Sequence, residues 1–147
     1  MLKKLDHVIM VVNNLETAVK AYEKILHLTP EGGSIREVTD LRIAMLPTKL
    51  GSRIELIEPK ETSRNRHAEF LKKRGEGVFG LSAFISDFEA EVKRLRDEGV
   101  TVIEEAQPSV HPGYSLRLGW IPPEEAGGVW IELVDVESLP PHLKKDL

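Results

Sequence analysis

The chain has 147 residues, a formal net charge of −4 and no cysteine. Hydrophobic residues make up 41% and charged residues 30%, a balance typical of a soluble globular domain. The small net charge favours neither nucleic acid nor an anionic membrane as a partner, and the lack of cysteine excludes disulfides, thiolate ligands and a cysteine nucleophile. We therefore expect a single cytoplasmic domain over residues 1–147, without a secretory signal or a membrane span.

The first half of the chain has the pattern of a strand, a helix and three further strands. Residues 7–12 are almost all apolar, as in a strand covered on both faces. Asn13 and Asn14 can cap a helix, and apolar residues then recur at helical spacing as far as Leu26. The expected elements are a strand over 7–12, a helix over 15–26, strands over 35–38, 41–46 and 53–58, and a connecting helix over 63–74.

The second half repeats this order. Ser86 and Glu89 have the spacing of a capping box, and Gly99 stands where a helix would end. The expected elements are a strand over 78–85, a helix from Phe88 to Gly99, strands over 100–104, 114–120 and 129–134, and a loosely held tail from Pro140.

The two halves can be superimposed in sequence. A shift of 73 residues aligns the two apolar helix faces and places His7 on Gly80, and a shift of 77 places Glu55 on Glu132. An internal repeat explains these matches better than a chance similarity of amphipathic patterns. We predict an α+β fold of two tandem βαβββ modules that face each other across an acidic cleft. The predicted parts are a first module over 5–60, a connecting helix over 61–76, a second module over 77–136 and a tail over 137–147.

Three residues could bind a metal ion. Glu55 and Glu132 lie in otherwise apolar strands, and strand alternation turns each carboxylate away from its apolar neighbours. A buried carboxylate requires a cation, a metal or water, whereas a half-exposed sheet would leave both in solvent. His7 would join them if the first and last strands of each half are adjacent. This oxygen-rich set suits cobalt, nickel, manganese or zinc.

Other polar residues have weaker patterns. His67 belongs to a basic stretch over 64–74 that could hold ligand phosphates, although a solvated helix face is the more common explanation. His111 lies in a loop that could close on a ligand or be simply exposed. Asp40 and Glu37 precede a strand, and either could reach a cleft as a proton acceptor.

Several segments resemble the vicinal oxygen chelate superfamily, and within it the methylmalonyl-CoA epimerase branch. The segments that carry the resemblance are residues 6–8, 15–18 with Tyr22, 54–59, 70–78 and 127–133. The resemblance implies paired βαβββ modules that form a curved mixed sheet around a metal cleft, usually in a homodimer. It also implies a divalent ion, a small-molecule substrate such as a CoA thioester, and metal ligands at His7, Glu55, Glu132 and position 80.

The chain departs from the epimerase pattern at two points. The epimerases read Gly-Glu-Gly-x-His-His-Ile-Ala-Phe where this chain has Gly80 at the second histidine, so the metal could be weakly bound or lost. The acidic base of the epimerases is replaced by Val38-Thr39-Asp40, which leaves Asp40 or Glu37 as substitutes.

Three functions follow as hypotheses. The first is an epimerase-like metalloenzyme that removes a proton next to a thioester carbonyl, with Glu132 also able to shuttle a proton. The second is a glyoxalase I-like lyase. The third is a metal-free binding protein of the bleomycin-resistance type. A purely structural protein fits the residues least well.

Overall fold

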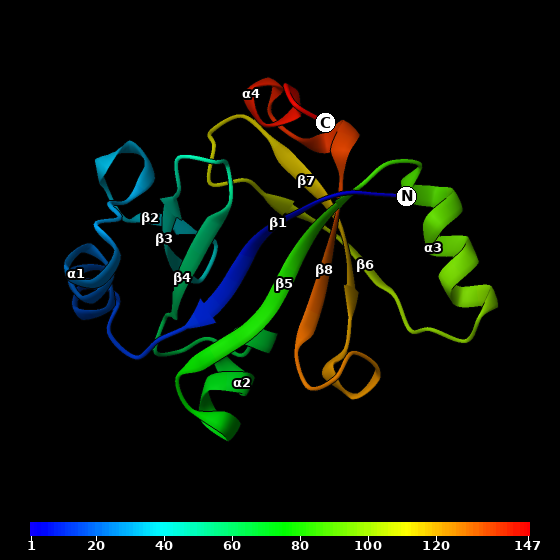
Figure 1. Cartoon of the computed structure of the whole chain (residues 1–147). Helices are drawn as coiled ribbons and strands as arrows, with labels where there is room; N and C mark the ends of the chain where they lie inside the picture. The colour runs from blue at the N-terminus through cyan, green and yellow to red at the C-terminus, as the bar shows by residue number, and fades with distance from the viewer. The chain divides into compact units, whose positions relative to one another are not determined.

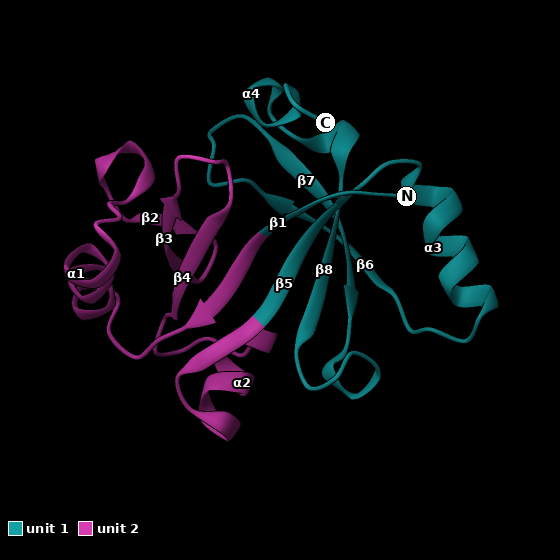
Figure 2. Ribbon diagram, in the orientation of Figure 1, with its two compact units in different colours: residues 1–6, 80–147 teal, residues 7–79 magenta.

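The computed structural model describes all residues, 1–147, and divides into two compact units (Figure 2). Unit 1 consists of residues 1–6 and 80–147, and unit 2 consists of residues 7–79. Strand β1 (Leu2–Val11) begins in unit 1 and continues into unit 2. None of the helices has the length and hydrophobicity that crossing a bilayer would require.

Unit 2 contains the first βαβββ module. After β1 it has α1 (Leu15–Leu26), a short 3-10 turn η1 (Glu31–Gly33), β2 (Arg36–Val38), β3 (Leu41–Pro47), β4 (Arg53–Pro59) and α2 (Arg66–Arg74). Its strands lie in the order β2-β3-β4-β1 (Figure 1). The β1–β4 pair is parallel and the other two pairs are antiparallel, so the sheet is mixed.

Helix α1 forms where the sequence predicts it and covers one face of these strands. The side chain of Asn14 accepts a hydrogen bond from the backbone N–H of Thr17, which satisfies one of the unpaired donors at the helix start. Leu15 of the helix packs with Ala44 of β3 and Leu56 of β4 in one apolar cluster. Burial of this cluster fixes which face of β4 is turned toward the helix.

The cap of α1 allows a direct test of helix stability. Replacing Asn14 by alanine leaves the N–H of Thr17 without its side-chain acceptor, so we expect a loss of about 1 kcal/mol in the free energy of unfolding. Urea unfolding followed by circular dichroism measures this loss. Asn13→Ala is the matched control, because Asn14 and not Asn13 supplies the side-chain cap. An equal loss in both variants would contradict the assignment.

Unit 1 contains the second module, except for residues 77–79 at the start of β5, which belong to unit 2. It has β5 (Gly77–Ile85), α3 (Phe88–Asp97), β6 (Ile103–Pro108), β7 (Ser115–Ile121), a 3-10 turn η2 (Pro123–Glu125), β8 (Trp130–Asp135), a 3-10 turn η3 (Val136–Ser138) and α4 (Pro141–Lys144). Its strands lie in the order β5-β8-β7-β6, with β5 and β8 parallel. Phe88 and Val92 of α3 pack against Leu133 of β8.

The hydrogen-bond register confirms the internal repeat. In the first module His7 pairs with Arg53 and Ile9 with Glu55. In the second module Gly80 pairs with Trp130, and Ser82 pairs with Glu132. These are the positions that the shifts of 73 and 77 residues relate, so each module builds the same pair of adjacent strands. The predicted fold class of tandem βαβββ modules is therefore confirmed.

Two local predictions are wrong. The capping box at Ser86 and Glu89 does not form, because Asp87 occupies the N-cap in a left-handed conformation (φ 54°) and makes no side-chain cap. Ser86 donates to the carboxylate of Asp87 instead. Strand β6 begins at Ile103 rather than at 100, since Val100 is hydrogen-bonded to Leu95 in the turn that ends α3.

The ends of the chain also differ from the prediction. The first strand begins at Leu2, so His7 lies within the strand rather than at its start. Met1 exchanges backbone hydrogen bonds with Ser86 at 2.8 and 2.9 Å, which holds the N-terminus in unit 1. The tail is not loose, because Leu139 is buried and Lys144 of α4 donates to the carbonyl oxygen of Glu137 at 2.7 Å.

Candidate functional site

Strand β4 presents two chemically different faces. Ile54 and Leu56 pack in the cluster under α1. Glu55 lies between them and therefore points to the opposite face, which it shares with Ile9 of β1 and Met45 of β3. The helix takes the apolar side, and the carboxylate is left on the other side, as the alternation of the sequence predicts.

His7 and Glu55 form a buried polar pair within unit 2. Their exposed fractions are 7% and 9%, which excludes a solvated pair on a half-exposed sheet. The Nε2 atom of His7 lies 3.7 Å from Oε1 of Glu55. Burial raises the pKa of Glu55, but the contact with His7 and the positive charges of His7, His67 and Arg53 outweigh it, so the pKa lies below its ordinary value. The site therefore holds Glu55 as a carboxylate.

The connecting helix adds a buried residue, His67, for which the sequence pattern favoured a solvated position. His67 is 4% exposed, so the expectation of a solvated helix face is wrong at this position. Its ring stacks on Phe79 with centroids 4.3 Å apart and planes inclined by 22°. The available signal was weak, since one histidine among basic residues is common on exposed helices.

Glu132 lies at the equivalent place in unit 1 and has its own hydroxyl partner. Ser82 is fully buried and donates a hydrogen bond of 2.6 Å to Oε1 of Glu132. Sequence reasoning did not single out Ser82. The repeat contained the signal, because it aligns Ser82 with Ile9, and a hydroxyl in place of a core isoleucine requires a polar partner.

Position 80 can hold no ligand in this backbone. A Cβ atom added to Gly80 would lie 2.5 Å from the carbonyl oxygen of Trp130, closer than real Cβ contacts come. Trp130 is the register partner of Gly80 on β8. Gly80 therefore supplies no metal ligand, and the lack of a side chain also allows β5 and β8 to approach closely. Glycine at this point of a strand is typical of such a backbone approach.

The donor set of unit 2 fits one divalent ion. Two ligand atoms that each lie about 2.1 Å from a common ion are separated by at most about 4.2 Å. The separation of 3.7 Å between His7 and Glu55 meets this condition. One imidazole nitrogen and carboxylate oxygens suit cobalt, nickel, manganese or zinc. The pair is therefore a competent half of a metal centre.

Asp40 does not lie near this pair. It occupies the turn between β2 and β3, where its carbonyl oxygen accepts from the N–H of Lys60, five residues beyond Glu55 along β4. Five extended residues span roughly 16 Å. Burial raises the pKa of Asp40. Hydrogen bonds from Asn65, its own backbone, Ser63 and Thr39 together lower the pKa by more than burial raises it, so the pKa lies below its ordinary value. The Asp40 carboxylate therefore stabilises the turn between β2 and β3.

The role of Asp40 in the turn predicts a pH-dependent contribution to stability. A carboxyl whose pKa is lowered by folding stabilises the protein above the ordinary pKa of about 3.9 and loses this contribution as the pH falls through the lowered pKa. We expect Asp40→Asn to reduce Tm at pH 7 and to have a smaller effect near pH 3. Differential scanning calorimetry at both values measures this. Asp146→Asn, in the exposed tail, is the control, and an equal deficit at both pH values would contradict the prediction.

Glu37 is placed on the other side of the sheet. It pairs across the strands with Arg42, and Arg42 pairs with Glu58, so the three share one face. Arg42 forms an ion pair with Glu16 of α1, which identifies this as the α1 face. Glu37 is exposed and contacts Lys60 at 3.5 Å. The structure therefore separates Glu37 from Glu55.

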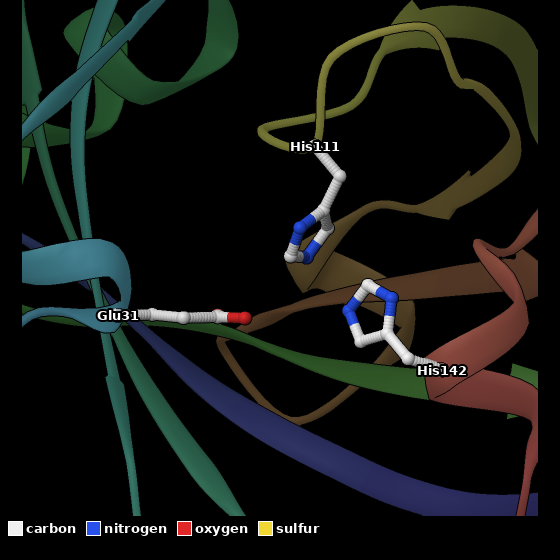
Figure 3. A group of neighbouring side chains, drawn as sticks. All are labelled: Glu31, His111 and His142. Carbon is white, nitrogen blue, oxygen red and sulfur yellow. The ribbon is translucent and has the colours of Figure 1, made fainter.

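His111 and His142 come together within unit 1. His111 lies in the loop between β6 and β7, and His142 belongs to α4 (Figure 3). Their ring centroids are 4.6 Å apart, with planes inclined by 78°. His111 is therefore only partly exposed and fastens its loop to the C-terminal helix. Glu31, which is drawn in the same view, belongs to η1 of unit 2.

Comparison with known families defines the class of this protein. The sequence pattern of the Glyoxalase/Bleomycin resistance protein/Dioxygenase superfamily matches residues 6–115. The chain therefore belongs to this superfamily, which confirms the resemblance seen in the sequence. No curated protein sequence matches the chain.

Solved structures of epimerases are similar over nearly the whole chain. Methylmalonyl-CoA epimerase from Mycobacterium tuberculosis has a TM-score of 0.78 and 32% identity, over 98% of this chain and 93% of that one. A hypothetical protein from Bacillus halodurans C-125 has a TM-score of 0.75 and 28% identity, over 90% and 93%. A Streptomyces coelicolor methylmalonyl-CoA epimerase variant in complex with 2-nitronate-propionyl-CoA has a TM-score of 0.71 and 25% identity, over 92% and 98%. These structures share the glyoxalase-like fold with this chain.

Proposed function

We propose that the protein is an isomerase of the epimerase type, which moves a proton at the carbon next to the carbonyl of a CoA thioester. The observation that carries the proposal is the buried His7–Glu55 pair, with its donors 3.7 Å apart on the face opposite α1. The similarity to epimerases supports the substrate class, because the Streptomyces coelicolor variant is in complex with a CoA compound, 2-nitronate-propionyl-CoA.

His7 and Glu55 are the proposed metal ligands of unit 2. Glu132 is the proposed ligand of unit 1, because the repeat places it at the position that Glu55 has in unit 2. A bound divalent ion would supply Lewis-acid polarisation of the substrate oxygens. The lowered pKa of Glu55 keeps its carboxylate ionised, as a metal ligand must be. The hydroxyl of Ser82 fixes the orientation of the Glu132 carboxylate, so the Glu132 side chain would lose little further entropy on binding a metal ion.

Two measurements test this function. The first is metal content after loading with cobalt or manganese and gel filtration, for which we expect about one divalent ion per chain. The second is exchange of the α-hydrogen of methylmalonyl-CoA in deuterium oxide, followed by proton NMR. Protein that binds no divalent ion and exchanges no α-hydrogen after loading would refute the proposal.

The lack of room for a side chain at position 80 favours a second candidate function, that of a metal-free binding protein. With no side chain accommodated at position 80, the four-ligand arrangement of the epimerase pattern cannot be rebuilt. The buried carboxylates would then hold a cationic small molecule. Binding of such a compound in the presence of a chelator, together with an absence of metal uptake, would favour this candidate over the enzyme.

A further inference from the structure

The face of unit 2 that carries His7 and Glu55 also carries an arginine. Arg53 pairs across the parallel strands with His7, and Ile9, the next residue of β1 on that face, pairs with Glu55 (Figure 1). Residues two apart on a strand point to the same side, so Arg53 and Glu55 share this face of β4. Adjacent strands are about 4.8 Å apart, and two residues along a strand span about 6.6 Å. Arg53 is therefore an immediate neighbour of both proposed ligands.

The guanidinium of Arg53 is buried together with its charge. The residue is 8% exposed, and a buried cation requires a counter-charge because its transfer out of water is costly. Glu31 provides one, with its Oε2 atom 3.7 Å from Nη1 of Arg53. This distance is that of an ion pair and exceeds the roughly 2.7–2.9 Å of a hydrogen bond between a guanidinium and a carboxylate. A ligand carboxylate that accepts two parallel N–H groups would bind the same guanidinium more closely.

Glu31 reaches Arg53 from a turn that is partly open to solvent. It lies in η1, where Gly32 and Gly33 adopt left-handed φ values of 70° and 73°. Glycine adopts such values without strain, which explains the two consecutive glycines in this turn. The side chain of Glu31 is 29% exposed, whereas that of Arg53 is 8% exposed. The ion pair therefore has a solvent-facing side, from which an anionic ligand can approach the guanidinium.

We propose that Arg53 recognises a free carboxylate on the substrate and thereby selects CoA thioesters that carry a carboxylate on the α-carbon. This inference rests on the proposed function, which supplies the thioester. The thioester carbonyl and the carboxylate of such a compound are attached to the same carbon. When the carbonyl lies against the His7–Glu55 pair, the carboxylate is therefore within one side-chain length of Arg53. The planar guanidinium matches a carboxylate through two parallel hydrogen bonds, a geometry that lysine does not provide.

A bound metal ion is the alternative partner for the same carboxylate. The two explanations differ in the presence of a chelator, which removes a metal ion but leaves the charge of Arg53 unchanged. Binding measured in EDTA therefore reports on Arg53 without a contribution from the ion.

The experiment measures the binding of methylmalonyl-CoA and propionyl-CoA by isothermal calorimetry in EDTA. The two thioesters differ only in the carboxylate on the α-carbon. The proteins are wild type, Arg53→Lys, Arg53→Gln and Arg94→Gln, and circular dichroism checks that each is folded. Arg94 is the matched control, because it is an exposed arginine of α3 that pairs with Glu91 and Glu98, its neighbours in sequence.

We expect wild type to bind methylmalonyl-CoA at least about 10-fold more tightly than propionyl-CoA, as a hydrogen bond to a charged group would provide. Arg53→Gln should lose this preference, while its affinity for propionyl-CoA changes less than about threefold, since that thioester offers Arg53 no carboxylate. Arg53→Lys should keep part of the preference, because lysine retains the charge without the paired donors. Arg94→Gln should match wild type.

Three results would overturn the role of Arg53. They are equal affinity of wild type for both thioesters in EDTA, a preference that survives in folded Arg53→Gln, and an equal loss of affinity for both thioesters in that variant, which would identify a structural role. If Arg53→Gln does not fold, an unchanged preference in Arg53→Lys overturns the role instead.

Exchange of the α-hydrogen in manganese-loaded wild type tests the proposed function separately. Exchange without a preference for the carboxylate overturns the role of Arg53 and leaves the proposed function intact. A preference that depends on Arg53, without any exchange, overturns the proposed function and supports Arg53 as the residue that binds the carboxylate.

Discussion

Glu55→Gln is expected to weaken divalent-ion binding by about 100-fold or more. Loss of a residue that merely orients a metal ligand costs 10–100-fold in affinity, so loss of the ligand charge itself should cost at least as much. Glutamine keeps the shape of the side chain but removes the negative charge that faces His7 at 3.7 Å. Titration with cobalt or manganese by isothermal calorimetry measures the change.

Glu58→Gln is the matched control for this substitution. Glu58 is on the same strand, but it faces α1, where it accepts from the N–H of Leu15 and pairs with Arg42. We expect a modest loss of stability and no change in ion affinity. If the two variants bind the ion equally, Glu55 is not a ligand. If both lose binding, the effect is structural, and the assignment also fails.

The second large effect concerns position 80. Gly80→Ala introduces a Cβ that would lie 2.5 Å from the backbone oxygen of Trp130, and a backbone atom in a paired strand cannot move without disturbing β8. We expect a loss of about 1–3 kcal/mol in the free energy of unfolding, as overpacked cores typically show. Gly80→His should be at least as destabilising and should not raise metal affinity. Urea unfolding and metal titration measure both effects.

Gly119→Ala provides the comparison for this prediction. A Cβ at Gly119 would lie 2.9 Å from a side-chain methyl of Val102, which can move more readily than a backbone carbonyl. We expect the smaller loss of stability at position 119. Higher metal affinity in a folded Gly80→His protein would contradict the prediction, since it would mean that position 80 can still accept a ligand.

These two positions explain why the sequence was informative about the site and incomplete about its chemistry. The alternation around Glu55 and Glu132 is a local property, because apolar neighbours on each strand must pack on a helix and leave the carboxylate opposite. The same alternation separates Glu37 from Glu55, but only the cross-strand pairing with Arg42 shows which face Glu37 occupies. The position of Glu37 near the start of a strand was therefore not enough to predict that it could act as a proton acceptor.

Contacts between distant segments had no local signal. Ser82 reaches Glu132 across 50 positions of sequence, and His67 reaches the Phe79 ring from a different element. The failed prediction of a capping box shows that a local sequence pattern can also mislead within a few residues. Ser86 and Glu89 have the correct spacing, but the left-handed conformation of Asp87 sets the direction in which the chain enters α3.

The sequence by itself determined the repeat, the order of the elements and the buried side of each central strand, because these follow from periodicity and from the pattern of polar residues. The superfamily was indicated by the resemblance of particular segments to its members. The tertiary structure decided what could not be read locally. It shows that Asp40 fastens a turn, that His67 is buried rather than solvated, and that Gly80 lies against a carbonyl oxygen. Each of these depends on which backbone or ring the fold brings within a few ångströms, and that choice is made by the packing of whole elements rather than by neighbouring residues.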